Sequence, residues 1–291
     1  MTIIDFQNVT KTFRRTAALD NISFQVPPGT VFALLGENGA GKTTAIRIML
    51  GLCKPDQGTS TVLGLNSRKD DLKIRQTLGY VPEQPVLYDW MTAEQTGHFA
   101  AAFYPDGFQR RYQTFLTEHD VPAAAKIRTL SKGQRAKVSL ALALAHDPEL
   151  LILDEPTSGL DALVRRQFLE SMIDRAASGK TVFLSSHQIG EVERVADTVA
   201  ILKKSKLLLV EPLESLKKRT HLITVTLNND EPLANVPLET VIETQKSGRE
   251  LRFVGHGLAG GSETFFQSHP NIARYEIRTP SLEEIFLGYM R

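Results

Sequence analysis

A glycine-rich segment near the N-terminus is the stretch whose residue types and spacing point most directly to chemistry. Residues 36–43 read Gly-Glu-Asn-Gly-Ala-Gly-Lys-Thr and follow a continuous apolar run at residues 31–35. Glycines at this spacing let successive backbone N–H groups curl around a phosphate, and the N-terminus of a following helix adds the positive end of its dipole. Lys42 can then contact the β- and γ-phosphates, and the Thr43 hydroxyl can ligate Mg²⁺. The pattern predicts a phosphate-binding loop between a buried strand and a helix, rather than a chance glycine-rich turn.

A second apolar run, at residues 150–153, ends in two carboxylates, Asp154 and Glu155. In an open parallel sheet, ligands bind at the carboxyl ends of the strands. Asp154 is placed to hold Mg²⁺ directly or through water, and Glu155 can orient or deprotonate an attacking water. A solvated acid often ends a strand, so this pair becomes a catalytic candidate because a phosphate loop accompanies it.

Alternating strands and helices must position these two segments. Apolar runs predict strands at residues 3–9, 22–26, 31–35, 59–63, 78–81, 150–154 and 181–184, and then a hairpin-like pair at 198–210. Helical patterns predict helices at about residues 42–50, 162–177 and 189–196. This order predicts an α/β fold with a mostly parallel sheet that is covered on both faces. Residues 92–146 are helical in pattern almost throughout, so we expect a helical subdomain inserted into the sheet.

The tail of the chain has a different pattern. Strands are predicted at residues 222–227, 250–254 and 272–277, with a glycine-rich turn at residues 255–261. Ser281 and Glu284 have the spacing of a capping box, which predicts a short helix from about Ser281 to Gly288. We therefore expect one domain over residues 1–220 and a small α+β accessory domain over residues 221–291.

Composition narrows the class of protein. The 291 residues include 34 Lys and Arg against 33 Asp and Glu, so no global basic field points to nucleic acid. Hydrophobic residues make up 42%, which is globular usage and excludes a disordered chain. No apolar run approaches the roughly 20 residues of a spanning helix, and the N-terminus lacks the pattern of a secretory signal. The single cysteine, Cys53, cannot form an internal disulfide, which fits a reducing compartment.

These segments and further motifs make residues 3–220 resemble the ATP-binding-cassette (ABC) ATPases, which have a P-loop NTPase core. Residues 130–134, Leu-Ser-Lys-Gly-Gln, resemble the family's signature, and residues 158–161, Ser-Gly-Leu-Asp, resemble its D-loop. His187 resembles the family's switch histidine, and Phe13 stands where the family stacks an aromatic ring on adenine. Each of these four motifs is weak alone, but together with the phosphate loop they make five in the family's order, and that combination is specific.

Two of these motifs also have a plainer interpretation from their residues. Ser131 and Gln134 have capping-box spacing at the start of a helix predicted over residues 132–145, and an ordinary helix cap has the same spacing. Such a helix end presents free N–H groups, which also suit a γ-phosphate. A lone histidine such as His187 is more often structural than catalytic, and only its position after a strand favours the second role.

The resemblance implies ATP and Mg²⁺ as ligands and assigns the site residues. The catalytic residues would be Lys42, Glu155 and His187. The nucleotide contacts would be Phe13, Gly36, Glu37, Asn38, Gly39, Ala40, Gly41, Lys42, Thr43, Thr44, Ser131, Lys132, Gly133, Gln134 and Asp161. The Mg²⁺ contacts would be Thr43, Asp154, and Glu83 or Gln84.

Two positions depart from the family's pattern. In the segment that resembles the Q-loop, residues 79–85, the usual glutamine position aligns with Glu83, and Gln84 comes one residue later. Either side chain could approach Mg²⁺ or the attacking water. Lys132 replaces the usual glycine of the signature, and it could either strengthen γ-phosphate binding or point into solvent. Both departures, and the tail ending at residues 280–287, occur in the exporter branch that handles antibiotics, lipids and ions.

The resemblance further implies partners. Two ATP molecules are sandwiched head to tail between two cassettes in this family, so a chain with one cassette needs a second ATPase subunit, identical or different. It also needs a separate integral membrane permease, which would place this chain in the cytoplasm on the inner face of the cell membrane. The leading function is therefore the ATP-hydrolysing subunit of an exporter, with no nucleic-acid partner.

Two alternatives remain. A soluble ABC ATPase that acts on the ribosome or on DNA usually fuses two cassettes or inserts a long coiled coil, and neither is present. A nucleotide-binding regulator without turnover is disfavoured by the presence of Glu155 and His187.

An aromatic turn follows the segment that resembles the Q-loop. Residues 85–91, Pro-Val-Leu-Tyr-Asp-Trp-Met, place large apolar side chains where a turn usually has polar ones. They could cover the core of the helical subdomain. In the ABC family a short helix of the membrane subunit enters the groove beside this loop, so we predict instead that Tyr88 and Trp90 are partly exposed.

Overall fold

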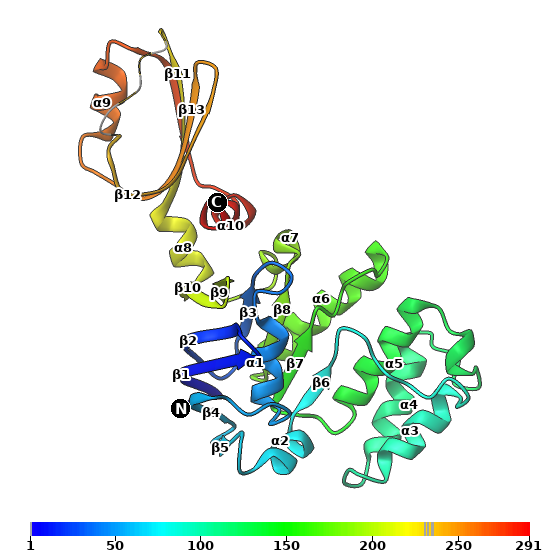
Figure 1. The fold of residues 1–291 in the computed structure, drawn as a ribbon. Helices are drawn as coiled ribbons and strands as arrows, with labels where there is room; N and C mark the ends of the chain where they lie inside the picture. The colour runs from blue at the N-terminus through cyan, green and yellow to red at the C-terminus, as the bar shows by residue number, and fades with distance from the viewer. Residues whose placement is uncertain (1, 230, 232, 234–235) are drawn as a thin grey trace. The chain divides into compact units, whose positions relative to one another are not determined.

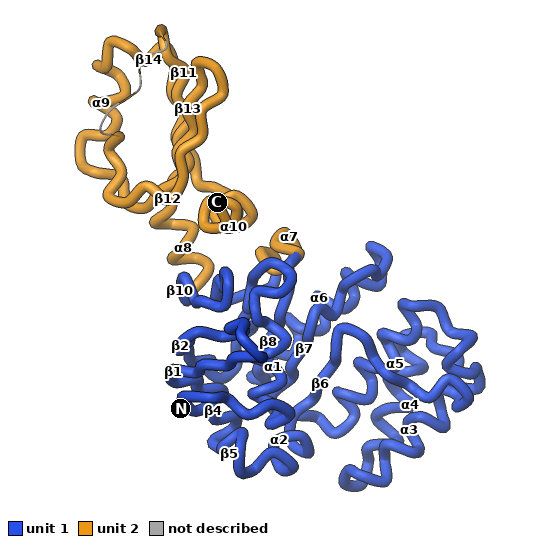
Figure 2. Tube along the Cα trace, in the orientation of Figure 1, with its two compact units in different colours: residues 1–187, 195–210 blue, residues 188–194, 211–291 orange. Residues whose placement is uncertain are grey.

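The computed structural model describes residues 2–229, 231, 233 and 236–291. The chain divides into two compact units, shown in different colours in Figure 2. The first unit comprises residues 1–187 and 195–210, and the second comprises residues 188–194 and 211–291. The boundary that we expected near residue 220 therefore falls inside the second unit, and a short segment after His187 also belongs there.

The first unit is built on a six-stranded sheet with the strand order β10-β9-β3-β8-β7-β6 (Figure 1). Its strands are β3 (Val31–Leu35), β6 (Gly79–Val81), β7 (Leu150–Asp154), β8 (Thr181–Ser186), β9 (Thr198–Lys203) and β10 (Lys206–Pro212). Five of them, from β9 to β6, pair in parallel, and every residue of β3, β7 and β8 is buried. Complete burial explains why these strands are uninterrupted apolar runs in the sequence. The predicted α/β fold with a mostly parallel sheet is confirmed.

A second, antiparallel sheet packs against the first, with the order β2-β1-β4-β5. Its strands are β1 (Ile4–Phe13), β2 (Thr16–Val26), β4 (Gln57–Val62) and β5 (Leu65–Asn66), followed by the helix α2 (Asp71–Thr77). Phe24 of β2 stacks on Phe32 of β3 with 5.5 Å between ring centroids, and Phe32 stacks on Phe183 of β8 at 5.6 Å. These buried rings join the two sheets into one core.

The helical subdomain lies between β6 and β7 in the chain, as predicted. It consists of α3 (Ala93–Ala101), α4 (Phe108–Glu118), the 3₁₀ turn η1 (Ile127–Thr129) and α5 (Lys132–Leu144), beside the β6 edge of the sheet in Figure 1. Tyr112 fills its core and donates a 2.7 Å hydrogen bond to the carbonyl of Ala93. A Cβ on Gly97 would lie 2.1 Å from the Tyr112 ring, so glycine is required for this packing.

The second unit contains a four-stranded antiparallel sheet with the order β12-β13-β11-β14. Its strands are β11 (Thr220–Leu227), β12 (Leu238–Ser247), β13 (Glu250–Leu258) and β14 (Ile272–Arg278). Its helices are α7 (Ile189–Val192), α8 (Leu213–Arg219), α9 (Ser262–Ser268) and α10 (Leu282–Met290). The glycine-rich turn predicted at residues 255–261 is wrong in its first half, because residues 255–258 continue β13. A Cβ on Gly255 would lie 2.5 Å from the Thr240 carbonyl oxygen, so this glycine allows a close approach of the paired strand rather than a turn.

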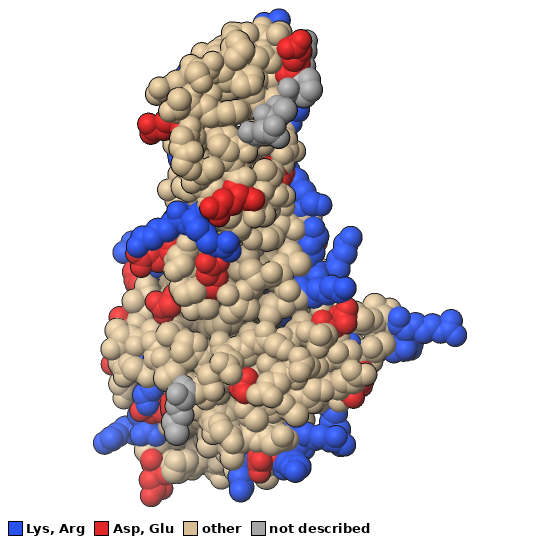
Figure 3. Space-filling view, turned by 90° about the vertical axis from the view of Figure 1, so that its left-hand side faces the viewer, with Lys and Arg blue, Asp and Glu red and all other residues tan. Residues whose placement is uncertain are grey.

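Charged side chains of both signs are interspersed on the face drawn in Figure 3. Within the described part of the chain, no helix has the length and apolar character that crossing a membrane requires.

Candidate active site

The predicted phosphate loop lies between β3 and α1 (Lys42–Met49). Gly39 and Gly41 have φ angles of 80° and 116°, which favour glycine. A Cβ on Gly41 would lie 2.2 Å from the Ala18 carbonyl oxygen, and a Cβ on Gly36 would lie 2.5 Å from the Leu202 carbonyl oxygen. A side chain at Gly36 or Gly41 would therefore clash with its surroundings. Because these positions have no side chain, the backbone N–H groups of the loop remain accessible to a phosphate.

Lys42 is buried at the start of α1, and its ammonium group is held inside the loop. It donates hydrogen bonds to the carbonyl oxygens of Gly36 (2.6 Å) and Glu37 (3.2 Å). The same nitrogen lies 3.1 Å from the Oε1 atom of Glu155, at the end of β7. The loop thus brings its lysine to the carboxylate that the sequence predicted as catalytic.

The two carboxylates after β7 are both buried, with exposed fractions of 2% for Asp154 and 7% for Glu155. Ser185, directly opposite Asp154 in the neighbouring strand β8, donates a 2.5 Å hydrogen bond to the Asp154 Oδ1 atom. Glu155 has a φ of 49°, an uncommon conformation for a residue with a side chain, and its N–H group donates to the Ser185 carbonyl oxygen at 3.1 Å. The strand β8 therefore fixes the position of both acids.

His187 completes this set from the end of β8. Its Nδ1 atom lies 2.7 Å from the Glu155 Oε2 atom, and its backbone N–H donates to the same oxygen at 3.2 Å. The structure thus brings the three predicted catalytic residues, Lys42, Glu155 and His187, into one contact chain. The Oε1 atom of Glu155 is buried, and the Lys42 ammonium group at 3.1 Å is its charged partner.

A cleft of about 280 Å³ opens over the loop. Its lining consists of Ala18, Glu37, Asn38, Gly39, Gly41, Lys42, Thr43, Thr44, Glu83 and Glu155. Gly36 and Ala40 lie in the loop beneath this lining, where the Ala40 N–H donates to the Glu37 carbonyl at 3.2 Å. No sequence pattern indicates Ala18, since only the fold brings β2 to the loop.

The cleft also bears on the choice between Glu83 and Gln84. Glu83 belongs to its lining, whereas Gln84 does not. On β6, just before this pair, burial raises the pKa of Tyr80 to about 12, and the negative charge of Asp154 adds to the rise.

The residues of the cleft, together with Asp154, which precedes Glu155 and does not line the cleft, fit a nucleotide phosphate and Mg²⁺. Bare backbone, a buried ammonium group and a helix N-terminus suit a phosphate. The described residues contain no cluster of three His, Cys, Asp or Glu side chains that could hold a metal ion. A hydroxyl at Thr43 and a carboxylate at Asp154 nevertheless fit Mg²⁺, which commonly takes one or two protein ligands and completes its shell with phosphates and water.

The residues that resemble the signature do not line this cleft. They form the N-terminus of α5, where the predicted capping box is present: the Ser131 hydroxyl accepts from the Gln134 N–H at 3.2 Å, and the Gln134 Oε1 atom accepts from the Ser131 N–H at 3.0 Å. A Cβ on Gly133 would lie 3.1 Å from Val164 Cγ2. The start of α5 therefore packs closely on the start of α6 (Ala162–Ala177), which Asp161 caps by accepting the Val164 N–H at 2.9 Å.

The exposed side chain of Lys132 lies beside the segment that resembles the D-loop. Its side chain lies across Gly159, because a Cβ on that glycine would be 2.1 Å from the Lys132 Nζ atom. Gly159 has a φ of 68° and belongs to the segment that resembles the D-loop. Lys132 thus lies along its own chain's D-loop.

Phe13 and the aromatic turn both lie at the surface. Phe13, at the end of β1, is half exposed, with the Lys11 ammonium 5.3 Å from its ring centroid. Tyr88 is 53% exposed and Trp90 is 65% exposed, which confirms the predicted exposure. Tyr88 contacts both Trp90 and Phe99, and Phe99 contacts Phe103. We call Tyr88, Trp90, Phe99 and Phe103 the aromatic patch.

Comparison with known sequences identifies the family of the chain. The family profile for the ABC transporter matches residues 19–158. The ABC transporter ATP-binding protein YhaQ of Bacillus subtilis is 30% identical over 295 residues, which cover 98% of this chain and 97% of YhaQ. An ABC transporter ATP-binding protein of Synechocystis sp. is 35% identical over 71% of this chain, and the chain spans 62% of its length. The probable multidrug ABC transporter ATP-binding protein YbhF of Escherichia coli is 35% identical over 75% of this chain and 39% of YbhF.

Solved structures show the same fold. The structure of an ATP-binding subunit of an ABC transporter superposes with a TM-score of 0.69 and 30% identity, covering 75% of this chain and 92% of the other. The dimeric structure of MJ0796, a bacterial ABC transporter cassette, superposes with a TM-score of 0.66 and 26% identity, covering 72% of this chain and 98% of the other. Together with the relatives, these likenesses establish that the chain belongs to the ABC transporter family of ATP-binding proteins.

Proposed function

We propose that this chain binds and hydrolyses ATP in order to power a separate membrane subunit of an ABC exporter. The observation that carries the proposal is the contact chain from Lys42 through Glu155 to His187. An ammonium group, a buried carboxylate and an imidazole thus meet at one end of a parallel sheet, beside a glycine-rich loop that suits a phosphate. Membership in the ABC transporter family supports the reaction class.

The chemistry follows from these positions. The loop and Lys42 would bind the β- and γ-phosphates, and water would attack the γ-phosphorus in line with the leaving ADP oxygen. Glu155 would orient this water and accept its proton, while His187 holds the carboxylate in place through the 2.7 Å contact. Thr43 and Asp154 would hold Mg²⁺, with Glu83 or Gln84 near it, and the bound ion would neutralise charge on the phosphates. Catalysis would thus rest on positioning and charge stabilisation.

A second cassette is part of the proposal. Ser131, Lys132, Gly133 and Gln134 lie outside the lining of their own chain's cleft and present the N-terminus of α5 at the surface. That placement suits a head-to-tail dimer, in which they would contact the γ-phosphate held by the other subunit. The related cassette MJ0796 has a dimeric structure, which supports a second cassette. Phe13 would stack on the adenine, and Asp161 would lie at the subunit interface.

The membrane subunit would dock on the aromatic patch. An apolar cleft of about 290 Å³ is lined by Leu52 after α1, Tyr80 on β6, and Tyr104 and His146 from the helical subdomain. The lining and the patch lie in the same unit, and in the chain Tyr80 precedes Glu83 and Tyr88 follows it. Exposed aromatic side chains are frequent anchors of interfaces, so a short apolar helix of a permease suits this surface. The similarity to the probable multidrug protein YbhF supports an exporter, and this docking would hold the chain at the inner face of the cell membrane.

Two measurements test the proposal. The purified chain should hydrolyse ATP in the presence of Mg²⁺. The full-length chain, carrying an affinity tag, should co-purify a hydrophobic integral membrane protein from detergent-solubilised membranes. A protein without ATPase activity would contradict the reaction, and recovery with ribosomes or DNA instead of a membrane protein would contradict the transport role.

A further inference from the structure

The segment that follows His187 belongs, by its contacts, to the second unit. Figure 2 shows residues 188–194 in the colour of that unit, and α7 within them packs against α10. Ile189 and Val192 of α7 are both buried. The chain therefore passes directly from the candidate catalytic histidine into the C-terminal unit.

Glu193 fastens this segment to two helices at once. Its Oε1 atom accepts a 2.6 Å hydrogen bond from the ammonium group of Lys217 on α8. Its Oε2 atom accepts from the N–H of Leu282, the first residue of α10, at 3.2 Å. The first N–H groups of a helix have no partner within the helix, and a carboxylate there also interacts favourably with the helix dipole. The Glu193 side chain is only 22% exposed, so both contacts are partly shielded from water.

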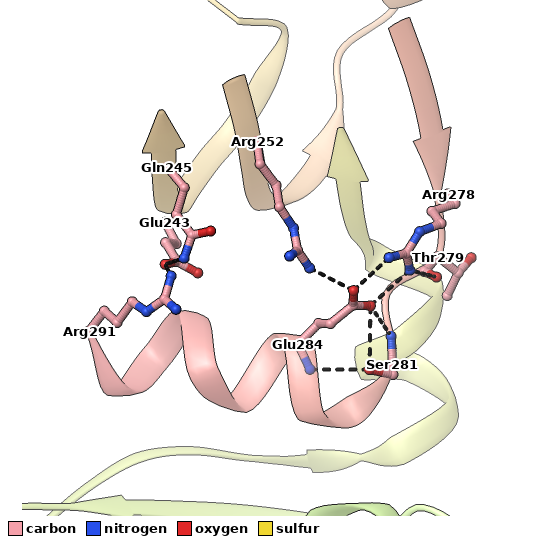
Figure 4. A network of polar contacts seen from close by, with 8 residues as sticks. All are labelled: Glu243, Gln245, Arg252, Arg278, Thr279, Ser281, Glu284 and Arg291. Carbon is pink, nitrogen blue, oxygen red and sulfur yellow. Dashed lines mark hydrogen bonds and ion pairs between the residues drawn. The ribbon is translucent and has the colours of Figure 1, made fainter. Parts of the chain in front are cut away.

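The helix α10 is in turn fixed to the sheet of the second unit (Figure 4). The Glu284 carboxylate accepts hydrogen bonds from Arg252 of β13 at 2.6 Å and from Arg278 of β14 at 2.5 Å. At the other end of the helix, Arg291 pairs with Glu243 of β12. Three strands therefore hold α10, and α10 offers Glu193 a fixed N–H group.

We propose that Glu193 is a positioning residue for ATP hydrolysis, because it anchors the segment behind His187 on α8 and α10. The C-terminal unit would then restrict where His187 lies and, through it, the Glu155 carboxylate. This inference rests on the proposed function, and it gives the C-terminal unit a role in turnover. A purely structural Glu193 would stabilise the second unit without affecting hydrolysis.

The test compares Glu193→Ala with a matched control, Glu211→Ala. Glu211 also makes a 2.6 Å ion pair with α8, through Arg219, and its side chain is 20% exposed. The hydrogen bonds described for its carboxylate come from Arg219. Both variants should lower the melting temperature of the protein. We expect Glu193→Ala to lower kcat about tenfold with an unchanged KM for ATP, because the phosphate loop is untouched. Glu211→Ala should keep kcat within about twofold of the unmodified chain.

The conservative variant Glu193→Gln and a measurement of amide hydrogen exchange distinguish a positioning role from a purely structural one. Glu193→Gln keeps an oxygen that can accept from the Leu282 N–H, so it should recover part of kcat. Amide hydrogen exchange at residues 186–194 should accelerate in Glu193→Ala and not in Glu211→Ala. Wild-type kcat in Glu193→Ala, or an equal loss of kcat in both alanine variants, would overturn the positioning role. If the unmodified chain hydrolyses no ATP, the proposed function is wrong. Hydrogen exchange still tests the anchoring in that case: unchanged exchange at residues 186–194 in Glu193→Ala would contradict it.

Discussion

At the scale of single residues, the site keeps three ionisable side chains almost completely buried. Burial of a charge is costly unless a partner compensates it. Lys42 and Glu155 compensate each other, and the Ser185 hydroxyl satisfies one oxygen of Asp154. A phosphate bound in the loop would give Lys42 a stronger partner than Glu155, which would leave Glu155 free to act on water.

The first prediction concerns Lys42. Lys42→Ala should weaken ATP binding about tenfold to a hundredfold, because a charge-assisted hydrogen bond to phosphate contributes about 1.5–3 kcal/mol. Equilibrium binding of a fluorescent ATP analogue measures the effect. Lys180→Ala is the matched control, since Lys180 pairs with Asp147 outside the cleft. Equal affinity in all three proteins would contradict the role of Lys42.

At the scale of helices and strands, much of the first unit could be predicted from the sequence. The strands at residues 31–35 and 150–154 have the predicted bounds, because a strand buried on both faces is an uninterrupted apolar run. The strand β12 was missed, because the sequence Leu-Glu-Thr-Val-Ile-Glu-Thr-Gln-Lys-Ser is mostly polar and lies at a sheet edge. An edge strand has a weaker apolar pattern than a central one.

The candidate site, too, could be predicted only in part from the sequence. The phosphate loop and the acidic pair could be predicted, since both are continuous in the sequence. The contact between Glu155 and His187 could not be derived from spacing, because it depends on the register that pairs Asp154 with Ser185 across two strands. The contacts of Glu193 with α8 and α10 join residues far apart in the chain, so no local pattern indicates them.

The second prediction concerns the attachment of α10 and its dependence on pH. The hydrogen bond from Arg278 lowers the pKa of Glu284 from 4.5 to about 2. Because the folded value lies below the unfolded one, Glu284 contributes its full stability above about pH 4.5 and loses it as the pH falls toward 2. Glu284→Gln should therefore reduce the free energy of unfolding by about 1–3 kcal/mol at pH 7, and by much less near pH 2.

Chemical denaturation at several pH values provides the measurement. Glu283→Gln is the control, because Glu283 is the exposed neighbour of Glu284 on the same helix. If both variants have the same stability profile between pH 7 and pH 2, the contacts of Glu284 do not stabilise the protein as the structure indicates.

At the scale of the whole molecule, the third prediction concerns the membrane partner. Trp90 is the only tryptophan, so its fluorescence reports the aromatic patch directly. Iodide should quench it in the isolated chain, and binding of the permease should shift the emission to the blue and protect it. Trp90→Ala should leave ATP binding unchanged and weaken assembly by about 1–4 kcal/mol. A permease that binds both proteins equally well would exclude Trp90 as an anchor.

The central claim is that Glu155 activates the water that hydrolyses ATP between two copies of the cassette. The most direct test measures ATP turnover and oligomeric state for Glu155→Gln, whose amide keeps the shape of the side chain but cannot accept the proton. We predict that turnover falls by about a hundredfold or more while ATP affinity is retained, and that the variant accumulates as a dimer in the presence of ATP. Hydrolysis by Glu155→Gln at the rate of the unmodified chain would contradict the account.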